Sequence, residues 1–266
     1  MPEGHKTHYL ARHHSDLLAG HKLRVVSPQG RFTEDAKQVD GQKLEAVQAI
    51  GKHLFYCFPK GRAIHVHLGR YGSFKEHVGA PEPKGLVRMR LMGPEITIDL
   101  NGPTQCRVID AEKRAEIEAG LGPDPLGTGT CDQAWQRVKA SQQPIGAILL
   151  DQSIIAGIGN IFRAELLFEL SLSPLTKGCD LTVSEFRALW KVLLRMMRVS
   201  TKHNQIIALT AREAGKPLHR LGSEERLRIY GKSHCPRCAC EISILNVAAR
   251  KLYVCPTCQG LSDASV

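Results

Sequence analysis

The spacing of residues that can face a protein core changes along the chain. Between positions 5 and 19 such residues recur three and four apart, and a glycine follows at position 20, which predicts a helix that ends there. These residues are Tyr9, Leu10, His14, Leu17 and Leu18. From about position 22 to position 110, short β-favouring runs such as KLRVVS, AIHVHLG and ITIDLNG alternate with turns rich in glycine and proline. This pattern predicts an antiparallel β-sandwich or barrel behind a leading helix.

The second half of the chain has helical spacing instead. A charged helix is predicted in AEKRAEIEAGLG, and the following LGPDPLGTGT has the glycine and proline density of a linker. Beyond position 131, four segments carry apolar residues at helical spacing, with Pro144 near the start of the second and Ser184 as the candidate N-cap of the fourth. They are CDQAWQRVKAS, PIGAILLDQSI, NIFRAELLFELSL and SEFRALWKVLLRMMRVSTKH.

These patterns predict a two-domain α+β chain. We expect an N-terminal β-sandwich domain over residues 1–122, a linker over 123–131, a helical domain over 132–224 and a metal-pinned hairpin over 225–266.

Two CxxC pairs near the end of the chain predict a zinc site. Cys235 and Cys238 lie in CPRC, Cys255 and Cys258 lie in CPTC, and sixteen residues separate the pairs. Four thiolates complete a tetrahedral coordination sphere, so the ion has a structural role and supplies folding free energy to a short tail.

The other cysteines are interpreted as bystanders. His234 and Cys240 flank the first pair and have the chemistry to act as alternative ligands, but the symmetry of the two CxxC turns favours the four cysteines. The remaining thiols lack paired spacing and are expected to be buried or inert: Cys57, Cys106, Cys131 and Cys179.

Charge and cysteine usage narrow the class of protein. The 36 Lys and Arg residues against 26 Asp and Glu give a formal charge of +10, which favours a polyanionic partner such as nucleic acid, although a basic surface also keeps a protein in solution. Nine cysteines without an N-terminal apolar signal segment, and no uninterrupted apolar run of membrane-spanning length, lead us to expect a soluble protein of the reducing cytoplasm.

The start of the chain offers a nucleophile. Removal of Met1 would expose the secondary amine of Pro2, and an α-amino group has a pKa of about 7.7 to 8.0, so part of it is neutral in a cell. A neutral amine can attack the anomeric carbon of a nucleoside, and the carboxyl of Glu3 and the amine of Lys52 are candidates for proton transfer. Taken singly, each residue also has an ordinary structural explanation.

The AGIGN sequence between two helical segments offers an anion site. Gly157 and Gly159 allow close approach of the backbone to a phosphate, and the N–H groups at the next helix start, with the Asn160 amide, can bind it. The alternative is a tight turn that needs glycine only for its conformation.

Taken together, these motifs resemble those of the formamidopyrimidine-DNA glycosylase and endonuclease VIII family of base-excision repair enzymes. The likeness covers nearly the whole chain: MPEG, GK at 51–52, HLGRYG at 67–72, LGPDPL, AGIGNIFRAE, CPRC and CPTC. It implies a monomeric DNA glycosylase and AP lyase with one structural zinc ion, which binds DNA containing damaged bases or abasic sites.

The resemblance also implies residue roles. Pro2 is the Schiff-base nucleophile, Glu3 and Lys52 transfer protons, and Asn160 binds a phosphate in a helix–two-turn–helix motif. Arg250 matches the family's zinc-finger arginine, which binds the phosphate beside the flipped nucleotide and assists the second elimination.

Within the family, GK at 51–52 and YG at 71–72 favour the endonuclease VIII branch, which prefers oxidised pyrimidines. That branch fills the gap left by the flipped base with a Gln-Leu-Tyr wedge, whereas this chain has Gly69, Arg70 and Tyr71. Tyr71 keeps the capacity to stack and Arg70 the capacity to contact a base or phosphate. We therefore hypothesise that duplex DNA matters less for this chain than for its relatives.

Two alternatives to the enzyme remain at this point. One is a non-catalytic zinc-ribbon protein that holds nucleic acid through its charge, Asn160 and Arg250, and the other is a damage sensor that flips lesions without turnover.

Overall fold

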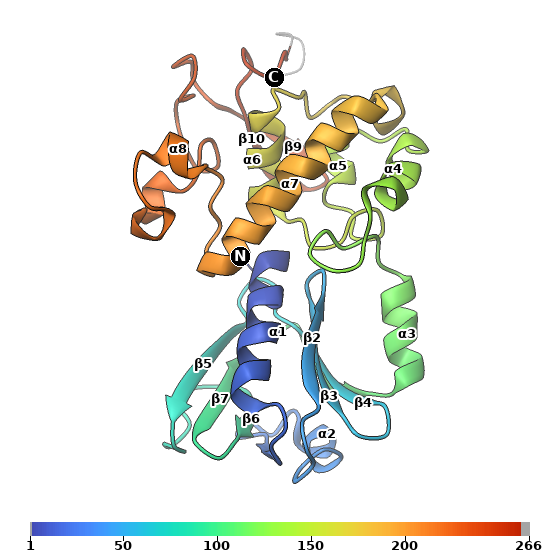
Figure 1. Cartoon of the computed structure of the whole chain (residues 1–266), viewed down its shortest axis with the longest axis vertical. Coiled ribbons are helices and arrows are strands. Elements are labelled where there is room, and N and C mark those ends of the chain that lie inside the picture. The colour runs from blue at the N-terminus through green and yellow to red at the C-terminus, as the bar shows by residue number, and fades with distance from the viewer. Residues whose placement is uncertain (1, 262–266) are drawn as a thin grey trace. The chain divides into compact units, whose positions relative to one another are not determined.

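The computed structural model describes residues 2–261 and divides into two compact units, one that ends at Gly120 and one that begins at Leu121 (Figure 1). Among the described residues, no helix combines the length and the apolar character needed to cross a membrane.

The first unit contains two four-stranded antiparallel sheets, as the sequence predicts. One sheet has the order β1 (Arg24–Val26), β6 (Val87–Met92), β7 (Ile96–Asn101), β5 (Ser73–Val78). The other has the order β2 (Ala46–Ile50), β3 (His53–Phe58), β4 (Arg62–His67), β8 (Gln105–Ile109). Apolar side chains of both sheets form one buried core, which includes Leu54, Tyr56, Ile98 and Leu100. Burial of these faces stabilises the sandwich.

Helix α1 (Gly4–Leu18) is the predicted leading helix, and Gly20 after it has a φ of +88°, the left-handed conformation that glycine tolerates best. His14 fixes the helix to both sheets, because its Nδ1 lies 2.6 Å from the Tyr56 hydroxyl on β3 and its Nε2 lies 3.5 Å from Glu76 on β5. The polar contacts therefore set the position of α1 on the sandwich.

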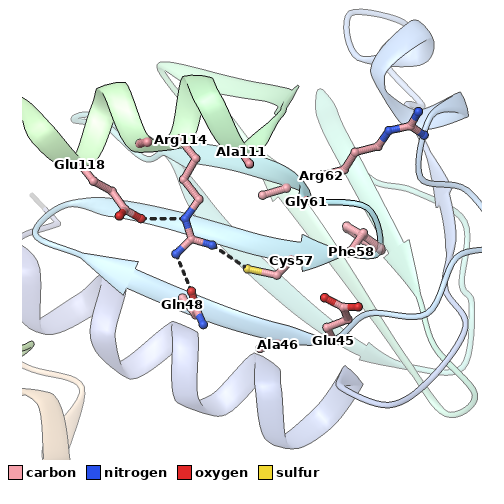
Figure 2. Close-up of a pocket in the computed structure, with 12 residues that line it drawn as sticks. Glu45, Ala46, Gln48, Cys57, Phe58, Gly61, Arg62, Ala111, Arg114 and Glu118 are labelled. Atoms are coloured by element: carbon pink, nitrogen blue, oxygen red, sulfur yellow. Dashed lines mark hydrogen bonds and ion pairs between the residues drawn. The ribbon is translucent and has the colours of Figure 1, made fainter.

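Two further helices complete the first unit, α2 (Thr33–Lys37) and α3 (Ala111–Ala119). Helix α3 is the predicted charged helix, and the Asp110 side chain caps it by accepting the Lys113 N–H. Arg114 on α3 points onto the second sheet, where it donates to Gln48 and to the Cys57 sulfur and lies 4.9 Å from the centre of the Phe55 ring (Figure 2).

The second unit is helical with one hairpin. Its helices are α4 (Cys131–Lys139), α5 (Ile145–Ile148), α6 (Asn160–Glu169), α7 (Val183–His203) and α8 (Ala211–Ala214), with 3₁₀ turns at 178–180, 218–220 and 223–225. The hairpin pairs β9 (Ser243–Val247) with β10 (Arg250–Val254). Val247, Leu252 and Val254 belong to the same buried cluster as Phe162 of α6.

Two sequence predictions need correction here. The segment PIGAILLDQSI is not one long helix: α5 ends at Ile148, and Asp151 then accepts the N–H and hydroxyl of Ser153, a local side-chain contact that competes with helix. The N-cap of α7 is Thr182 and not Ser184, because Thr182 and Glu185 form a reciprocal capping box.

Candidate functional site

The first turn of α1 presents two of the predicted catalytic residues. Pro2 is half-buried and directly precedes Glu3, which is the N-cap of the helix in an extended conformation and whose side chain is 0 % exposed. The Glu3 carbonyl accepts the Lys6 N–H at 2.8 Å, so the helix begins immediately after it. The Glu3 carboxyl is therefore buried directly beside the start of the chain.

Thr7 links this helix start to the turn that carries Lys52. Its hydroxyl lies 2.6 Å from the Gly51 carbonyl oxygen and 2.9 Å from the Gly4 carbonyl oxygen. The turn between β2 and β3 is thereby held at the first turn of α1, and residues 44 positions apart in sequence lie together at the same end of the unit. Thr7 was not predicted from the sequence; the feature that marks it is a polar side chain on the buried face of an amphipathic helix.

Neutral imidazoles lie near Lys52. His53 Nδ1 is 2.8 Å from His65 Nε2, and the His53 and His67 rings, which are paired across β3 and β4, meet edge to face with centroids 5.1 Å apart. Burial, followed by nearby positive charge, lowers the pKa of His53 to about 4 and that of His65 to about 3. Near pH 7 these rings are uncharged, so they add hydrogen-bonding groups to this part of the sheet without adding cations.

Burial also keeps His5 neutral on α1, since it lowers the pKa of this ring to about 3. The alternating histidines in HVH were visible in the sequence, but their contact with His53 depends on the register of β3 against β4.

The turn between β4 and β5 carries the two predicted DNA-contact residues of this unit. Tyr71 is 77 % exposed, and the Arg70 guanidinium lies 5.4 Å from the centre of its ring. Gly69 has a φ of +63°, and a Cβ built there would overlap the Thr104 side chain. A glutamine at position 69 is therefore incompatible with this turn conformation, which agrees with the altered wedge read from the sequence.

A cavity of about 570 Å³ lies elsewhere in the first unit, between α3 and the sheet of β2, β3 and β4 (Figure 2). Arg114 and the half-buried Cys57 help to line it, and burial raises the pKa of the Cys57 thiol. The described residues that line this cavity include none of the predicted site residues.

In the second unit, Asn160 is the first residue of α6 and is only 6 % exposed. Its side-chain Nδ2 donates to the Lys251 carbonyl at 2.8 Å, and its Oδ1 accepts from Arg163 at 2.5 Å. The Asn160 amide, for which the sequence predicts a phosphate contact, therefore binds the hairpin in this structure. Gly157, which precedes the helix, has a φ of +92°, which explains the need for glycine at that point of the turn.

Arg163 is a residue that the sequence analysis missed. Its guanidinium is fully buried and donates to the carbonyls of Gly146 and Val247 at 2.9 and 3.0 Å, besides Asn160. The bond to Gly146 joins α6 to α5, and the bond to Val247 joins α6 to the end of β9, close to the exposed Arg250 at the start of β10. The structure therefore brings Asn160 and the backbone next to Arg250 together.

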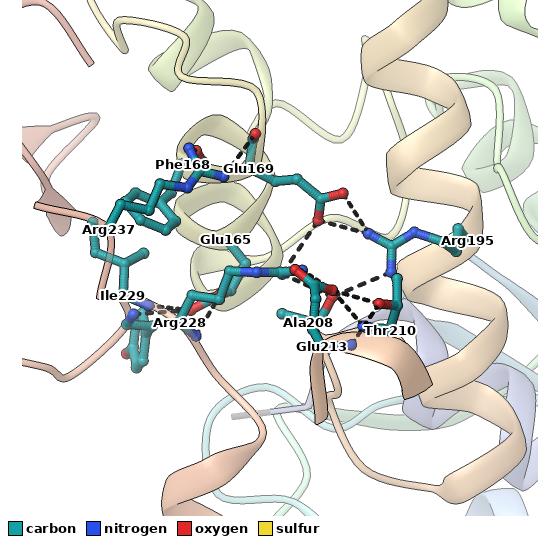
Figure 3. Close-up of polar contacts among 11 residues, drawn as sticks. Glu165, Phe168, Glu169, Arg195, Ala208, Thr210, Glu213, Arg228, Ile229 and Arg237 are labelled. Atoms are coloured by element: carbon teal, nitrogen blue, oxygen red, sulfur yellow. Dashed lines mark hydrogen bonds and ion pairs between the residues drawn. The ribbon is translucent and has the colours of Figure 1, made fainter. Parts of the chain in front are cut away.

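A second polar network holds the irregular segment that precedes the hairpin. The buried Glu165 carboxylate accepts the backbone N–H groups of Arg228, Ile229 and Tyr230 at 2.9 to 3.0 Å (Figure 3). Burial raises the pKa of Glu165, and these three N–H groups act in the opposite direction. The Arg228 Nη2 group also donates to both carboxylate oxygens of Glu213, at 2.7 and 2.8 Å, which fixes α8 to the same segment.

The four predicted zinc ligands lie together. The sulfurs of Cys235, Cys238, Cys255 and Cys258 are all within 4.8 Å of one another, and three of their separations are 3.5, 3.6 and 3.8 Å. Zinc–sulfur bonds of about 2.3 Å in a tetrahedron place sulfurs about 3.8 Å apart, so this donor set fits one zinc ion.

Backbone N–H groups support the same assignment. The Arg237 N–H points to the Cys235 sulfur and the Cys258 N–H points to the Cys255 sulfur, at 3.4 and 3.2 Å. Such contacts stabilise thiolates. Cys240, interpreted from sequence as a bystander, has its sulfur 3.2 Å from that of Cys238 and 3.3 Å from that of Cys255.

Comparison with known protein families gives two matches. Residues 1–115 match the formamidopyrimidine-DNA glycosylase N-terminal domain, and residues 121–211 match the formamidopyrimidine-DNA glycosylase H2TH domain.

Individual relatives match over nearly their whole length. Endonuclease 8 1 of Mycobacterium tuberculosis is 41 % identical and covers 97 % of this chain and 100 % of its own. Formamidopyrimidine-DNA glycosylase of Thermus thermophilus is 29 % identical and covers 98 % of this chain and 99 % of its own.

Solved structures share the fold. The crystal structure of MutM (Fpg) from Thermus thermophilus has a TM-score of 0.79 and 29 % identity, and it covers 97 % of this chain and 99 % of its own. A complex of Lactococcus lactis Fpg with DNA containing N7-benzyl-Fapy-dG has a TM-score of 0.80 over the same shares at 19 % identity.

Proposed function

Because the chain belongs to the formamidopyrimidine-DNA glycosylase and endonuclease VIII family, we propose that it removes oxidised pyrimidines from DNA through a covalent intermediate on Pro2. It is a DNA glycosylase of base excision repair with AP lyase activity, and its partner is DNA with damaged bases or abasic sites. The observation that carries the proposed chemistry is the Thr7 contact that holds the Lys52 turn at the start of α1.

The pyrimidine preference follows the branch of the family. The 41 % identity to Endonuclease 8 1, against 28 to 29 % for two of the relatives named formamidopyrimidine-DNA glycosylase, supports the endonuclease VIII branch. The GK and YG motifs at 51–52 and 71–72 favour the same branch.

The proposed reaction begins with the neutral amine of Pro2. Its nitrogen forms a bond to C1′ of the damaged nucleoside as the bond to the base breaks, and the departing base takes up a proton. The nitrogen then loses its proton, the C1′–O4′ bond opens as O4′ takes up a proton, and an iminium results. This iminium acidifies the neighbouring sugar carbon, so loss of a proton there expels the 3′ phosphate, and a second elimination expels the 5′ phosphate. Glu3 and Lys52 are proposed to move these protons, which is supported by their placement at one end of the unit.

Asn160 and Arg250 are proposed to hold phosphates. The helix start at Asn160 favours an anion through its N–H groups, and Arg250 stands exposed at the start of β10. The bonds from Arg163 and Asn160 to the hairpin fix their relative positions. One zinc ion, held by the four cysteines, would supply folding free energy to this hairpin.

A panel of defined lesions tests this proposal. Oligonucleotides carrying an oxidised pyrimidine, an oxidised purine or an abasic site are incubated with the protein, and the cut ends are identified. We expect the highest rate among the damaged bases on the oxidised pyrimidine, with phosphate left on both sides of a one-nucleotide gap. A higher rate on the oxidised purine overturns the branch assignment, and binding without any cutting favours the non-catalytic alternatives.

A further inference from the structure

The hairpin contains a fifth thiol beside its four-cysteine cluster. We propose that Cys240 is a reserve zinc ligand, which takes the place of Cys238 when that sulfur leaves the ion. The inference rests on the zinc site proposed above and concerns a residue outside the four-cysteine motif. Its consequence is a hairpin that keeps its metal when the most accessible ligand is lost.

The positions of the sulfur atoms are the first support for this proposal. The Cys240 sulfur is 3.2 Å from that of Cys238 and 3.3 Å from that of Cys255, whereas the paired ligands Cys238 and Cys255 are 3.5 Å apart. Cys240 therefore lies against one edge of the ligand tetrahedron. A shift comparable to one sulfur–sulfur distance brings it to the Cys238 position.

Exposure explains which ligand would be replaced. Cys235 and Cys255 are buried at 3 % and 0 % exposure, while Cys238 is exposed. An exposed thiolate is the one that solvent, oxidants and alkylating groups reach first. Cys240 is half-buried and is thus better protected than the ligand beside it.

The backbone conformation places Cys240 next to the four-cysteine cluster. Ala239 has a φ of +60°, an uncommon left-handed conformation for a residue with a side chain, and its N–H donates to the Cys235 carbonyl at 2.9 Å. The Cys240 carbonyl in turn accepts the Cys235 N–H at 2.9 Å. These two backbone bonds close the CPRC turn into a loop and keep Cys240 beside the cluster.

The second CxxC turn, CPTC, provides a comparison for the first, CPRC. Cys258 occupies the same place in CPTC that Cys238 occupies in CPRC, but two residues further on the chain has Gly260 instead of a cysteine. Replacement of the second cysteine in each pair should therefore have unequal effects.

The exchange conserves ligand number and charge. The bond between zinc and the Cys238 sulfur breaks and that sulfur takes up a proton, while Cys240 gives up its thiol proton to water and its thiolate forms the new bond. Four thiolates surround the ion before and after, and no electron is transferred.

The experiment compares full-length proteins with Cys238→Ser, Cys258→Ser, Cys240→Ser, and Cys238→Ser combined with Cys240→Ser. Zinc content is measured after dialysis against a competing chelator, and the thiolate-to-cobalt absorption is recorded after exchange of zinc for cobalt. We expect full zinc content and an undiminished cobalt band for the Cys238→Ser and Cys240→Ser proteins. The Cys258→Ser and double variants should lose zinc or show the weaker band of three thiolates.

The outcomes separate the reserve role from the zinc site itself. Loss of zinc by Cys238→Ser to the same extent as by Cys258→Ser overturns the reserve role while leaving the site intact. A wild-type protein without zinc overturns the site. If a variant fails to fold, limited alkylation of the folded proteins replaces it: wild type alkylated at Cys238 should retain zinc, Cys240→Ser alkylated at Cys238 should release it, and release by both contradicts the proposal.

Discussion

The proposed role of Lys52 in proton transfer depends on the residues around it. It lies on a turn that Thr7 holds at the start of α1, and the histidines that flank it on the sheet are neutral near pH 7. Lys60, by contrast, is exposed on the turn between β3 and β4.

The substitution Lys52→Ala should reduce strand incision by about 10²- to 10⁴-fold, the range typical of a lost general acid or base. Lys60→Ala is the matched control and should leave the rate within a few-fold of wild type. Single-turnover incision of an abasic oligonucleotide measures both. Equal rates for the two variants would remove Lys52 from the proposed chemistry.

Thr7 is proposed to position the turn that carries Lys52. Thr7→Val keeps the shape of the side chain but deletes the hydroxyl that binds the Gly51 carbonyl. We expect a loss of about 1–2 kcal/mol in stability, because the buried Gly51 carbonyl loses the Thr7 hydroxyl as a donor, and a larger fall in incision rate than in DNA affinity. Thr33→Val is the control, since that exposed hydroxyl makes a comparable bond to the Gly30 carbonyl. A fall in affinity equal to the fall in rate would argue against a positioning role.

At the scale of elements, regular spacing in the sequence predicted more of the structure than side-chain chemistry did. The leading helix, the alternating strands and the paired cysteines were readable because each depends on periodicity or on fixed local spacing. The Thr7–Gly51 bond, the His53–His65 pair and the buried Arg163 were not readable, because each requires knowing which distant segment lies opposite. The early end of α5 was missed because a local Asp151–Ser153 contact outweighed apolar spacing.

The β4–β5 turn carries a prediction of its own. With glycine at position 69, held in a left-handed conformation against Thr104, the turn offers Arg70 and an exposed Tyr71 in place of a three-residue wedge. Since less of the gap in a duplex can be filled, the chain should depend less on a second strand. We expect faster cutting of a lesion in single-stranded DNA than in duplex DNA in matched single-turnover assays. Cutting in duplex that equals or exceeds the single-strand rate contradicts this.

At the scale of the whole molecule, the chain consists of two units with separate cores, and the division into four parts, including a hairpin domain at 225–266, stays a prediction. The hairpin shares its core with the helices of the second unit, and that packing depends on contacts that no local pattern in the sequence encodes. The formal charge of +10 suits a DNA partner at this scale.

The buried histidines make the stability of the first unit depend on pH. The pKa values of His5, His53 and His65 are about 3, 4 and 3 in the folded chain, below the ordinary 6.5. As the pH falls below 6.5, the unfolded chain binds protons on these histidines before the folded chain does. The free energy of unfolding therefore decreases between pH 6.5 and the lower pKa values of the folded chain, by at most about 1.4 kcal/mol per pH unit for each group.

Urea unfolding at about pH 7 and about pH 5 measures this dependence. His65→Phe preserves the stack with Phe55 and should give a smaller loss of stability between the two pH values than wild type. His21→Phe, at an exposed position, should retain the wild-type loss. An unchanged pH dependence in His65→Phe would show that this ring is not the titrating group.

The most direct test of the account is chemical capture of the bound intermediate. Borohydride is added during incubation with an abasic oligonucleotide, and the linked peptide is identified by mass spectrometry. We expect a stable adduct on the nitrogen of Pro2 in protein that has lost Met1, and no adduct with Pro2→Gly or with protein that retains Met1. Capture at another residue, or incision by protein that retains Met1, would contradict it.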